Sequence, residues 1–234
     1  MTSASAPRTR REITVDALAI GAATGAYGIS FGALGVTNGF DLWQTQALSL
    51  FMFTGASQFA LVATLGAGGA ALAAVATAVL LGLRNGLYAL SLARPLGWRG
   101  WHRPALAHLT IDESTAMAVA QFEDPDPAAM QAAMRYAFVT TGLSVLLLWN
   151  LGTLIGSVSA SVVGDPRTYG LDAAAAAAFL ALLWPRLVHR EARVVAIVAA
   201  LVTLVLIPLV SPGLPVLASS LVALAAGLWR GGDA

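Results

Sequence analysis

Eight apolar stretches separated by short polar turns make up most of this chain. A membrane-spanning helix needs about 20 predominantly apolar residues, and most of the stretches approach or exceed that length. The pattern therefore predicts an all-α, polytopic integral membrane bundle, embedded in a lipid bilayer. The stretches are Val15–Val36, Leu42–Leu65, Ala70–Leu92, Leu106–Ala120, Tyr136–Ser157, Ala173–Leu187, Val194–Val210 and Leu214–Trp229.

Composition excludes an ordinary soluble domain. Of the 234 residues, 58% are hydrophobic and only 11% are charged, against about 25% charged in a typical soluble domain. We expect a cytoplasmic N-terminal tail over residues 1–12, a single transmembrane domain over residues 13–230 and a C-terminal tail over residues 231–234. The net charge of +1 indicates no nucleic-acid partner, and the absence of cysteine excludes disulfides and iron–sulfur sites.

Arginine clusters constrain the topology, because cytoplasmic loops of membrane proteins collect positive charge. If every cluster faces the cytoplasm, an even number of crossings separates each from the next. Yet three apolar stretches lie between the first and second clusters, and three more lie between the second and third. One stretch of each trio should therefore fail to cross. The clusters are the N-terminal tail, Arg94 with Arg99 and Arg103, Arg186 with Arg190 and Arg193, and Arg230.

Two stretches are the candidates for broken or re-entrant segments. Val15–Val36 contains five glycines, which disfavour a long continuous helix, and Leu106–Ala120 is short and contains two carboxylates. The prediction is six crossings plus these two broken segments, with both termini cytoplasmic in the inner membrane. Broken backbone at membrane depth is tolerated where it is buried in protein or lines a cavity, so a substrate cavity is expected between the two segments.

Charged groups inside apolar stretches are the leading candidates for function. Asp112 and Glu113 could bind an ammonium group or take up a proton, or they could lie at a loop end in water. Arg84 could pair with one of these carboxylates for structural reasons or contact a substrate directly, and Asn85 and Tyr88 accompany it on the same stretch.

Uncharged polar and small residues leave two interpretations open. Gln58 could join helices by hydrogen bonds or anchor a helix break. Gly28 and Gly32 could let two helices approach closely, or they could leave an unwound backbone whose amide groups receive a carboxylate.

One motif suggests an enzyme instead. Gly28-Ile-Ser30-Phe-Gly32 matches the G-x-S-x-G nucleophile pattern, which has a catalytic meaning only at a strand-to-helix elbow or with a histidine inside the membrane to activate the serine. The three histidines lie in or beside arginine-rich loops. An intramembrane serine hydrolase and a non-transporting structural subunit are the alternatives to a transporter. No metal or cofactor motif is present in the sequence.

Four segments together resemble the AzlC-type branched-chain amino acid permease family, in matching order and spacing. They are Gly28–Gly32, Phe53-Thr-Gly-Ala-Ser-Gln-Phe59, Leu83-Arg-Asn-Gly-Leu-Tyr88 and Thr110-Ile-Asp-Glu113. The resemblance implies a secondary transporter subunit that works with a small AzlD-type membrane subunit. It would export branched-chain or other hydrophobic amino acids from the cytoplasm, coupled to the proton gradient.

The resemblance also sharpens the candidate site. Asp112 and Glu113 are the expected proton-coupling residues, and Phe31, Phe53 and Phe59 are candidates for an apolar pocket. One departure is Asn85, where the family often has histidine, which puts a histidine-based proton relay in doubt. The expected substrate-binding residues are Gly28, Ser30, Gly32, Gly55, Gln58, Phe59, Arg84, Asn85 and Tyr88.

Overall fold

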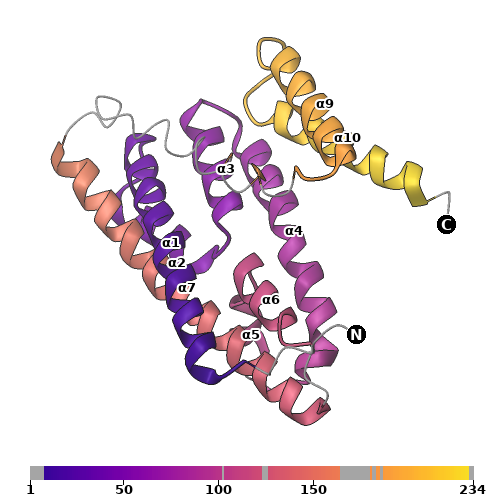
Figure 1. Ribbon diagram of the computed structural model, residues 1–234. Coiled ribbons are helices and arrows are strands. Elements are labelled where there is room, and N and C mark those ends of the chain that lie inside the picture. The colour runs from indigo at the N-terminus through magenta and orange to yellow at the C-terminus, as the bar shows by residue number, and fades with distance from the viewer. Residues whose placement is uncertain are drawn as a thin grey trace.

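Helices form all the regular structure in the described part of this computed structural model (Figure 1). The structure describes residues 8–101, 103–122, 126–163, 180, 183–184 and 187–231. The all-α prediction is therefore confirmed. The expected crossing over residues 173–187 lies almost entirely outside the described residues, as do His102, Arg186 and most of the N-terminal tail.

The longest contact in the bundle joins two parallel helices, α1 (Arg10–Thr37) and α7 (Pro127–Val163). The glycines of α1 face α7 so closely that the two backbones touch. A Cβ added to Gly28 would lie 2.6 Å from the carbonyl oxygen of Trp149, and one added to Gly32 would overlap that of Thr153. The same holds in the opposite direction, because Gly156 of α7 lies against the backbone of α1.

The prediction that glycine breaks Val15–Val36 is wrong, because α1 is continuous over 28 residues. Glycine disfavours a helix in water chiefly through its freedom in the unfolded chain. In a membrane, small residues let helices approach closely, so the glycines promote packing. The close-approach interpretation of Gly28 and Gly32 is the correct one, and the unwound-backbone interpretation is wrong.

Three helices in the described residues are long and apolar enough to span a bilayer: α1, α4 (Ala71–Leu96) and α7. Contacts place the end of α4 beside the starts of α1 and α7. Arg135 Nε of α7 donates a hydrogen bond to the carbonyl oxygen of Leu96, and the Arg10 guanidinium lies over the Tyr136 ring. Helix α4 therefore runs antiparallel to α1 and α7, and this end of the bundle is rich in arginine.

Between α1 and α4 the chain makes a re-entrant excursion. Helices α2 (Leu42–Phe51) and α3 (Gly55–Gly66) have 10 and 12 residues, so they are about 15 and 18 Å long against a hydrocarbon core of about 30 Å. Both outer ends lie near Asn38, which caps α1 and approaches Gly66 at the end of α3. The prediction of a single crossing over Leu42–Leu65 is therefore wrong.

A second excursion between α4 and α7 begins at the opposite, arginine-rich end. It consists of α5 (Arg103–His108) and α6 (Asp112–Val119), with 6 and 8 residues. The prediction of a broken segment over Leu106–Ala120 is confirmed. Its polar N-terminal residues, Asp112 and Glu113, begin α6 directly after the break.

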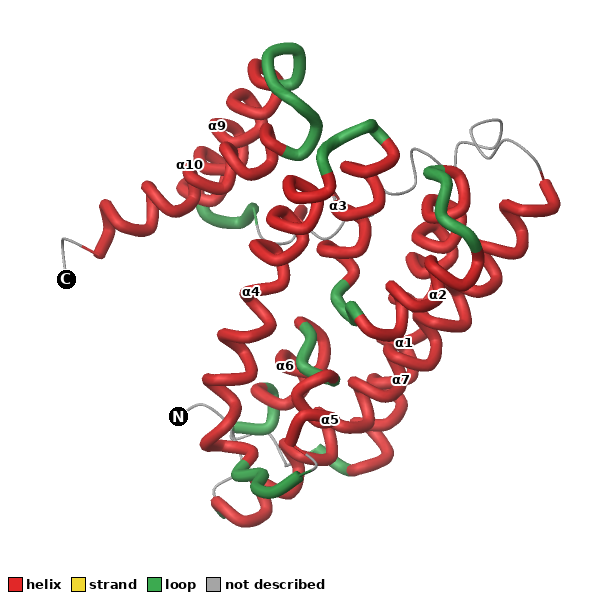
Figure 2. The backbone as a smooth tube through the Cα atoms, turned by 180° about the vertical axis from the view of Figure 1, so that it is seen from behind, coloured by secondary structure: helices red, strands yellow, loops and turns green. Residues whose placement is uncertain are grey.

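The two breaks meet inside the bundle (Figure 2). His108 Nε2 lies 2.8 Å from the carbonyl oxygen of Leu50, and because a carbonyl can only accept, the histidine donates. The His108 ring also packs on Phe53, with centroids 5.6 Å apart. The second excursion thus supplies a hydrogen-bond donor for a carbonyl group at the broken end of α2.

The C-terminal helices α9 (Arg190–Leu206) and α10 (Leu214–Gly231) pack on each other and touch the rest of the described bundle near the start of α4 (Figure 1). Thr77 donates a weak hydrogen bond, 3.5 Å long, to the carbonyl oxygen of Gly213. The count of six crossings is not confirmed, because the described residues contain three helices that meet the length and hydropathy of a span.

The re-entrant topology makes a direct prediction about labelling. The chain has no cysteine, so single cysteines can be introduced at the exposed positions Thr37, Ala67 and Arg99. In sealed vesicles, a membrane-impermeant thiol reagent should label positions 37 and 67 from the same side and position 99 from the opposite side. Labelling of position 37 together with 99, and of position 67 from the other side, would mean that α2 and α3 cross the membrane after all.

Candidate functional site

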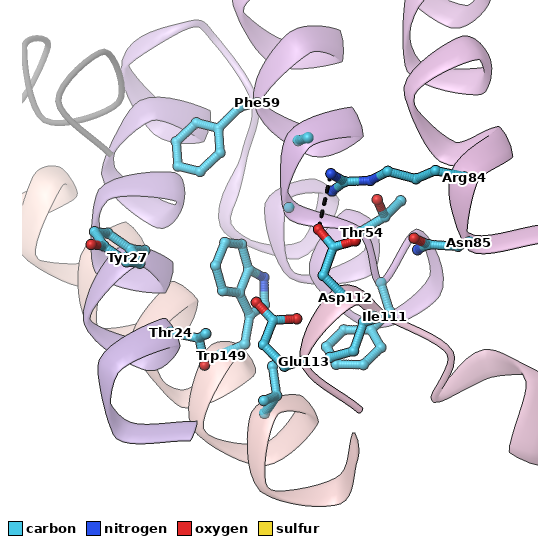
Figure 3. Close-up of a pocket in the computed structure, with 14 residues that line it drawn as sticks. Thr24, Tyr27, Thr54, Phe59, Arg84, Asn85, Ile111, Asp112, Glu113 and Trp149 are labelled. Carbon is cyan, nitrogen blue, oxygen red and sulfur yellow. Dashed lines mark ion pairs between the residues drawn. The ribbon is translucent and has the colours of Figure 1, made fainter. Parts of the chain in front are cut away.

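A cavity of about 80 Å³ lies where the two helix breaks face α1, α4 and α7 (Figure 3). One side of it is polar and charged, and the other is aromatic. The lining residues come from, or directly precede, five helices that are far apart in the sequence: α1, α3, α4, α6 and α7. Helix α2 lies behind the lining. The lining residues are Thr24, Tyr27, Phe53, Thr54, Gly55, Ala56, Phe59, Arg84, Asn85, Ile111, Asp112, Glu113, Val145 and Trp149.

The charged side of the cavity is built around an ion pair. Arg84 from α4 and Asp112 from α6 lie 2.9 Å apart, and their side chains are 38% and 23% exposed. Figure 3 shows both side chains and that of Glu113 directed toward the cavity. The site therefore holds one cationic and two carboxyl side chains, a concentration of charge that is costly at membrane depth unless it serves a function.

Polar atoms of two α4 side chains lack partners within the protein. The Arg84 Nε and the Asn85 Oδ1 are buried and make no hydrogen bond. A buried polar group without a partner is destabilising by about 1–3 kcal/mol, so native proteins leave few of them. Both residues line the cavity, where a polar ligand could complete their hydrogen bonds.

The start of α3 forms a second polar wall. Its first internal hydrogen bond runs from the Gln58 amide to the Thr54 carbonyl, and no side chain caps this end. The backbone N–H groups of Gly55, Ala56 and Ser57 are therefore the free donors of the first turn. Gly55 and Ala56 line the cavity, so the positive end of the α3 dipole is directed at the same space as Arg84.

The opposite wall is aromatic. Phe59 packs edge-on against Trp149 with centroids 6.3 Å apart, and both line the cavity together with Phe53. Phe31 is fully buried behind them, stacked on Trp149 and edge-on to Phe59. Of the three phenylalanines expected in an apolar pocket, Phe53 and Phe59 reach the cavity surface and Phe31 supports it.

Gln58 is fully buried and lies behind this wall, outside the cavity lining. Its Nε2 donates to the carbonyl oxygens of Leu48 and Ser49 at the broken end of α2, and its Oε1 accepts from Trp149 Nε1. The side chain therefore closes the helix break and fixes the indole of Trp149. Both interpretations of Gln58, helix joining and support of a break, describe what it does.

Several expected site residues lie away from the cavity. Gly28 and Gly32 pack against α7. Their amide groups belong to the continuous helical backbone of α1 and are not available to a substrate. Ser30 is half-buried within the same helix, and Tyr88 lies one turn beyond Arg84; neither lines the cavity. The strand-to-helix elbow required by the G-x-S-x-G interpretation is absent here, because Ser30 is in the middle of a continuous helix.

Other cavity residues were not expected from the sequence. Thr24 and Tyr27 come from α1 and Trp149 from α7, and these helices meet only in the folded bundle. Trp149 lies inside an apolar stretch, and its indole N–H there could have indicated a role in the site. Tryptophan in membrane proteins is more often found in the headgroup layer, so the residue alone did not predict it. Among the described residues, no group of three or more histidine, aspartate or glutamate side chains could hold a metal ion.

Comparison with known proteins places the chain among membrane proteins. Two proteins of Helicobacter pylori, from strains 26695 and J99 and each described as an uncharacterized membrane protein, are 28% identical over 155 residues. The match covers 66% of this chain and 65%, just under two thirds, of each relative. No solved structure shows a significant match. The family model described as AzlC protein matches residues 19–163, which include α1 to α7 almost entirely, and the chain therefore belongs to the AzlC family.

Proposed function

We propose that this membrane protein is a subunit of a secondary transporter that exports branched-chain or other hydrophobic amino acids from the cytoplasm. The observation that carries the proposal is the cavity between two broken helices, with the Arg84–Asp112 ion pair on one side and an aromatic wall on the other. Discontinuous helices that end at mid-membrane are typical of substrate sites in secondary transporters.

The arrangement suits an amino acid because each part of a zwitterion finds a complement. The carboxylate would bind Arg84 and the free amides at the start of α3, and the ammonium group would bind Asp112 or Glu113. The aliphatic side chain would lie against Phe59 and Trp149. Arg84 and Asp112 pair with each other in the structure, so the substrate would take the place of an internal ion pair.

The size of the cavity implies movement during transport. About 80 Å³ is room for roughly three water molecules at about 30 Å³ each, whereas leucine has nine non-hydrogen atoms. The closely packed α1 and α7 pair forms one wall, and α3, α4 and α6 form the other. Separation of Arg84 from Asp112 would release α6 from α4 and widen the cavity, which is how a substrate could trigger a change of access.

Proton coupling is the form of energy input that the charges favour. One guanidinium and two carboxyl groups line the cavity, and acidic side chains inside membrane bundles are typical of proton relays. A proton carried on Glu113 or Asp112 would leave when a substrate ammonium group arrives. The coupling ion would thereby compete with the substrate for one acidic group.

Orientation and partner complete the proposal. The arginine-rich end, with Arg94 and Arg99 beside the start of α1, would face the cytoplasm of the inner membrane. Both termini would then be cytoplasmic, with further crossings formed by the C-terminal third. Membership of the family supports a small AzlD-type membrane subunit as the partner needed for activity.

Efflux from preloaded cells tests this function. Cells that express the chain together with its small partner should release labelled leucine, isoleucine, valine or methionine faster than cells with either protein alone. Collapse of the proton gradient should slow the release. If none of the four amino acids leaves faster in any combination, the proposed substrate class is wrong.

A further inference from the structure

A second hollow lies on the outside of the bundle, between α4 and α5. It is a groove of about 520 Å³, within the range of about 300–1,000 Å³ that is common for ligand sites. Leu90 and Leu96 of α4, Leu106 of α5 and Phe138 of α7 form its apolar walls, and Trp98 packs edge-on against Phe138 with centroids 5.2 Å apart. Leu90 is 74% exposed, so the groove opens toward the surroundings of the bundle.

The groove has the depth of one membrane leaflet. It follows α4 from Gly86 to Leu96, which is about 15 Å of helix, or half of a hydrocarbon core about 30 Å thick. Its shallow end lies at the arginine-rich end of the bundle, where Trp101 is 90% exposed. Exposed tryptophan at such a position is typical of the headgroup layer.

The described residues that line the mouth carry positive charge only. Arg103 is the only charged side chain among the described residues that line the groove, and the exposed Arg99 lies four positions before it. An apolar channel of leaflet length with a cationic mouth is complementary to a lipid that has an acyl chain and a negatively charged headgroup.

We propose that this groove, formed by α4 and α5, is a binding site for an anionic phospholipid, with an acyl chain along α4 and the phosphate at Arg103. The deep end of the groove reaches Gly86 and Thr110. These residues directly follow Asn85 and precede Ile111, both of which line the substrate cavity. The bound acyl chain therefore supports α5 and the break before α6 from the outer side of the bundle, and it holds Asp112 within reach of Arg84.

Thermal unfolding of the purified full chain in detergent tests the site, with phosphatidylglycerol or phosphatidylcholine added. Phosphatidylglycerol at a hundred times its dissociation constant should raise the unfolding midpoint by about 5 °C or more, and phosphatidylcholine by much less. Arg103→Gln should remove the difference between the two lipids. Gly86→Leu should weaken both effects by filling the groove, since a Cβ added at Gly86 meets open space.

Matched variants separate the site from general effects. Arg94 is exposed near the end of α4 but does not line the groove, so Arg94→Gln should keep the full preference for phosphatidylglycerol. Gly227 of α10 also faces open space, and Gly227→Leu should behave as the original chain does. Equal stabilisation by both lipids, or a preference that survives Arg103→Gln and Gly86→Leu, would overturn the proposal.

Discussion

An Arg84→Ala variant is expected to transport at least 10-fold, and up to about 100-fold, more slowly than the original chain. The change removes the cation that pairs with Asp112 at 2.9 Å and would bind the substrate carboxylate. Hydrogen bonds to charged groups contribute about 1.5–3 kcal/mol, and the partial exposure of both side chains places the effect below that of a fully buried pair. Initial rates of efflux, normalised to the amount of protein in the membrane, give the measurement.

Two further variants show whether the effect belongs to binding or to folding. Arg84→Gln combined with Asp112→Asn removes both charges of the pair together, so neither residue is left as an ion without its partner, and this double variant should fold and remain inactive. Arg94→Ala removes an arginine from the same helix outside the cavity and should keep normal efflux. An active double variant would show that the ion pair is structural and that substrate is bound elsewhere.

A Gly32→Ala variant is expected to lose about 3 kcal/mol of stability. The added methyl group would overlap the carbonyl oxygen of Thr153 and lie 2.7 Å from the amide nitrogen of Ser157. Overpacking in a close-packed interior generally costs about 1–3 kcal/mol, and the upper value applies here because backbone atoms cannot rotate away. For a chain of this size the midpoint of thermal unfolding should fall by about 6–12 °C.

Gly86→Ala is the matched control for this change. Gly86 is also within a long helix, α4, but a Cβ there meets nothing within 4 Å. Because alanine is the better helix former by about 1 kcal/mol, this variant should be as stable as the original chain or slightly more so. Equal midpoints for Gly32→Ala and Gly86→Ala would mean that α1 and α7 do not pack backbone to backbone.

The fold was predictable from the sequence at the level of its class, and less so for its breaks. Apolar length identified α4 and α7 as membrane helices, but it mistook the re-entrant segment Leu42–Leu65 for a crossing, and the glycines of α1 were mistaken for a break. The carboxylates Asp112 and Glu113 correctly marked the break before α6. The break after α2 has no such signal. Residues Phe51–Thr54 contain neither glycine nor proline, and the broken end is stabilised by Gln58 and His108 from other elements.

The candidate site was predictable in its charged part. Arg84, Asn85, Asp112 and Glu113 attract notice in any apolar sequence, and the structure brings all four together. The aromatic wall depends on Trp149, which bonds to a residue 91 positions earlier. No pattern within one helix could have indicated that contact, because it exists only once α7 has packed against α1 and α3.

The glycine-lined contact between α1 and α7 has a consequence for how this protein is made. Ser157 donates a hydrogen bond to the carbonyl oxygen of Gly32 across 125 positions of sequence, and ribosomes add about 5–20 residues per second. The first helix therefore waits roughly 6 to 25 s in the bilayer before its partner has been synthesised. During that interval its glycine face is open to lipid, to the insertion machinery and to membrane proteases, so a newly made chain is most vulnerable before α7 emerges.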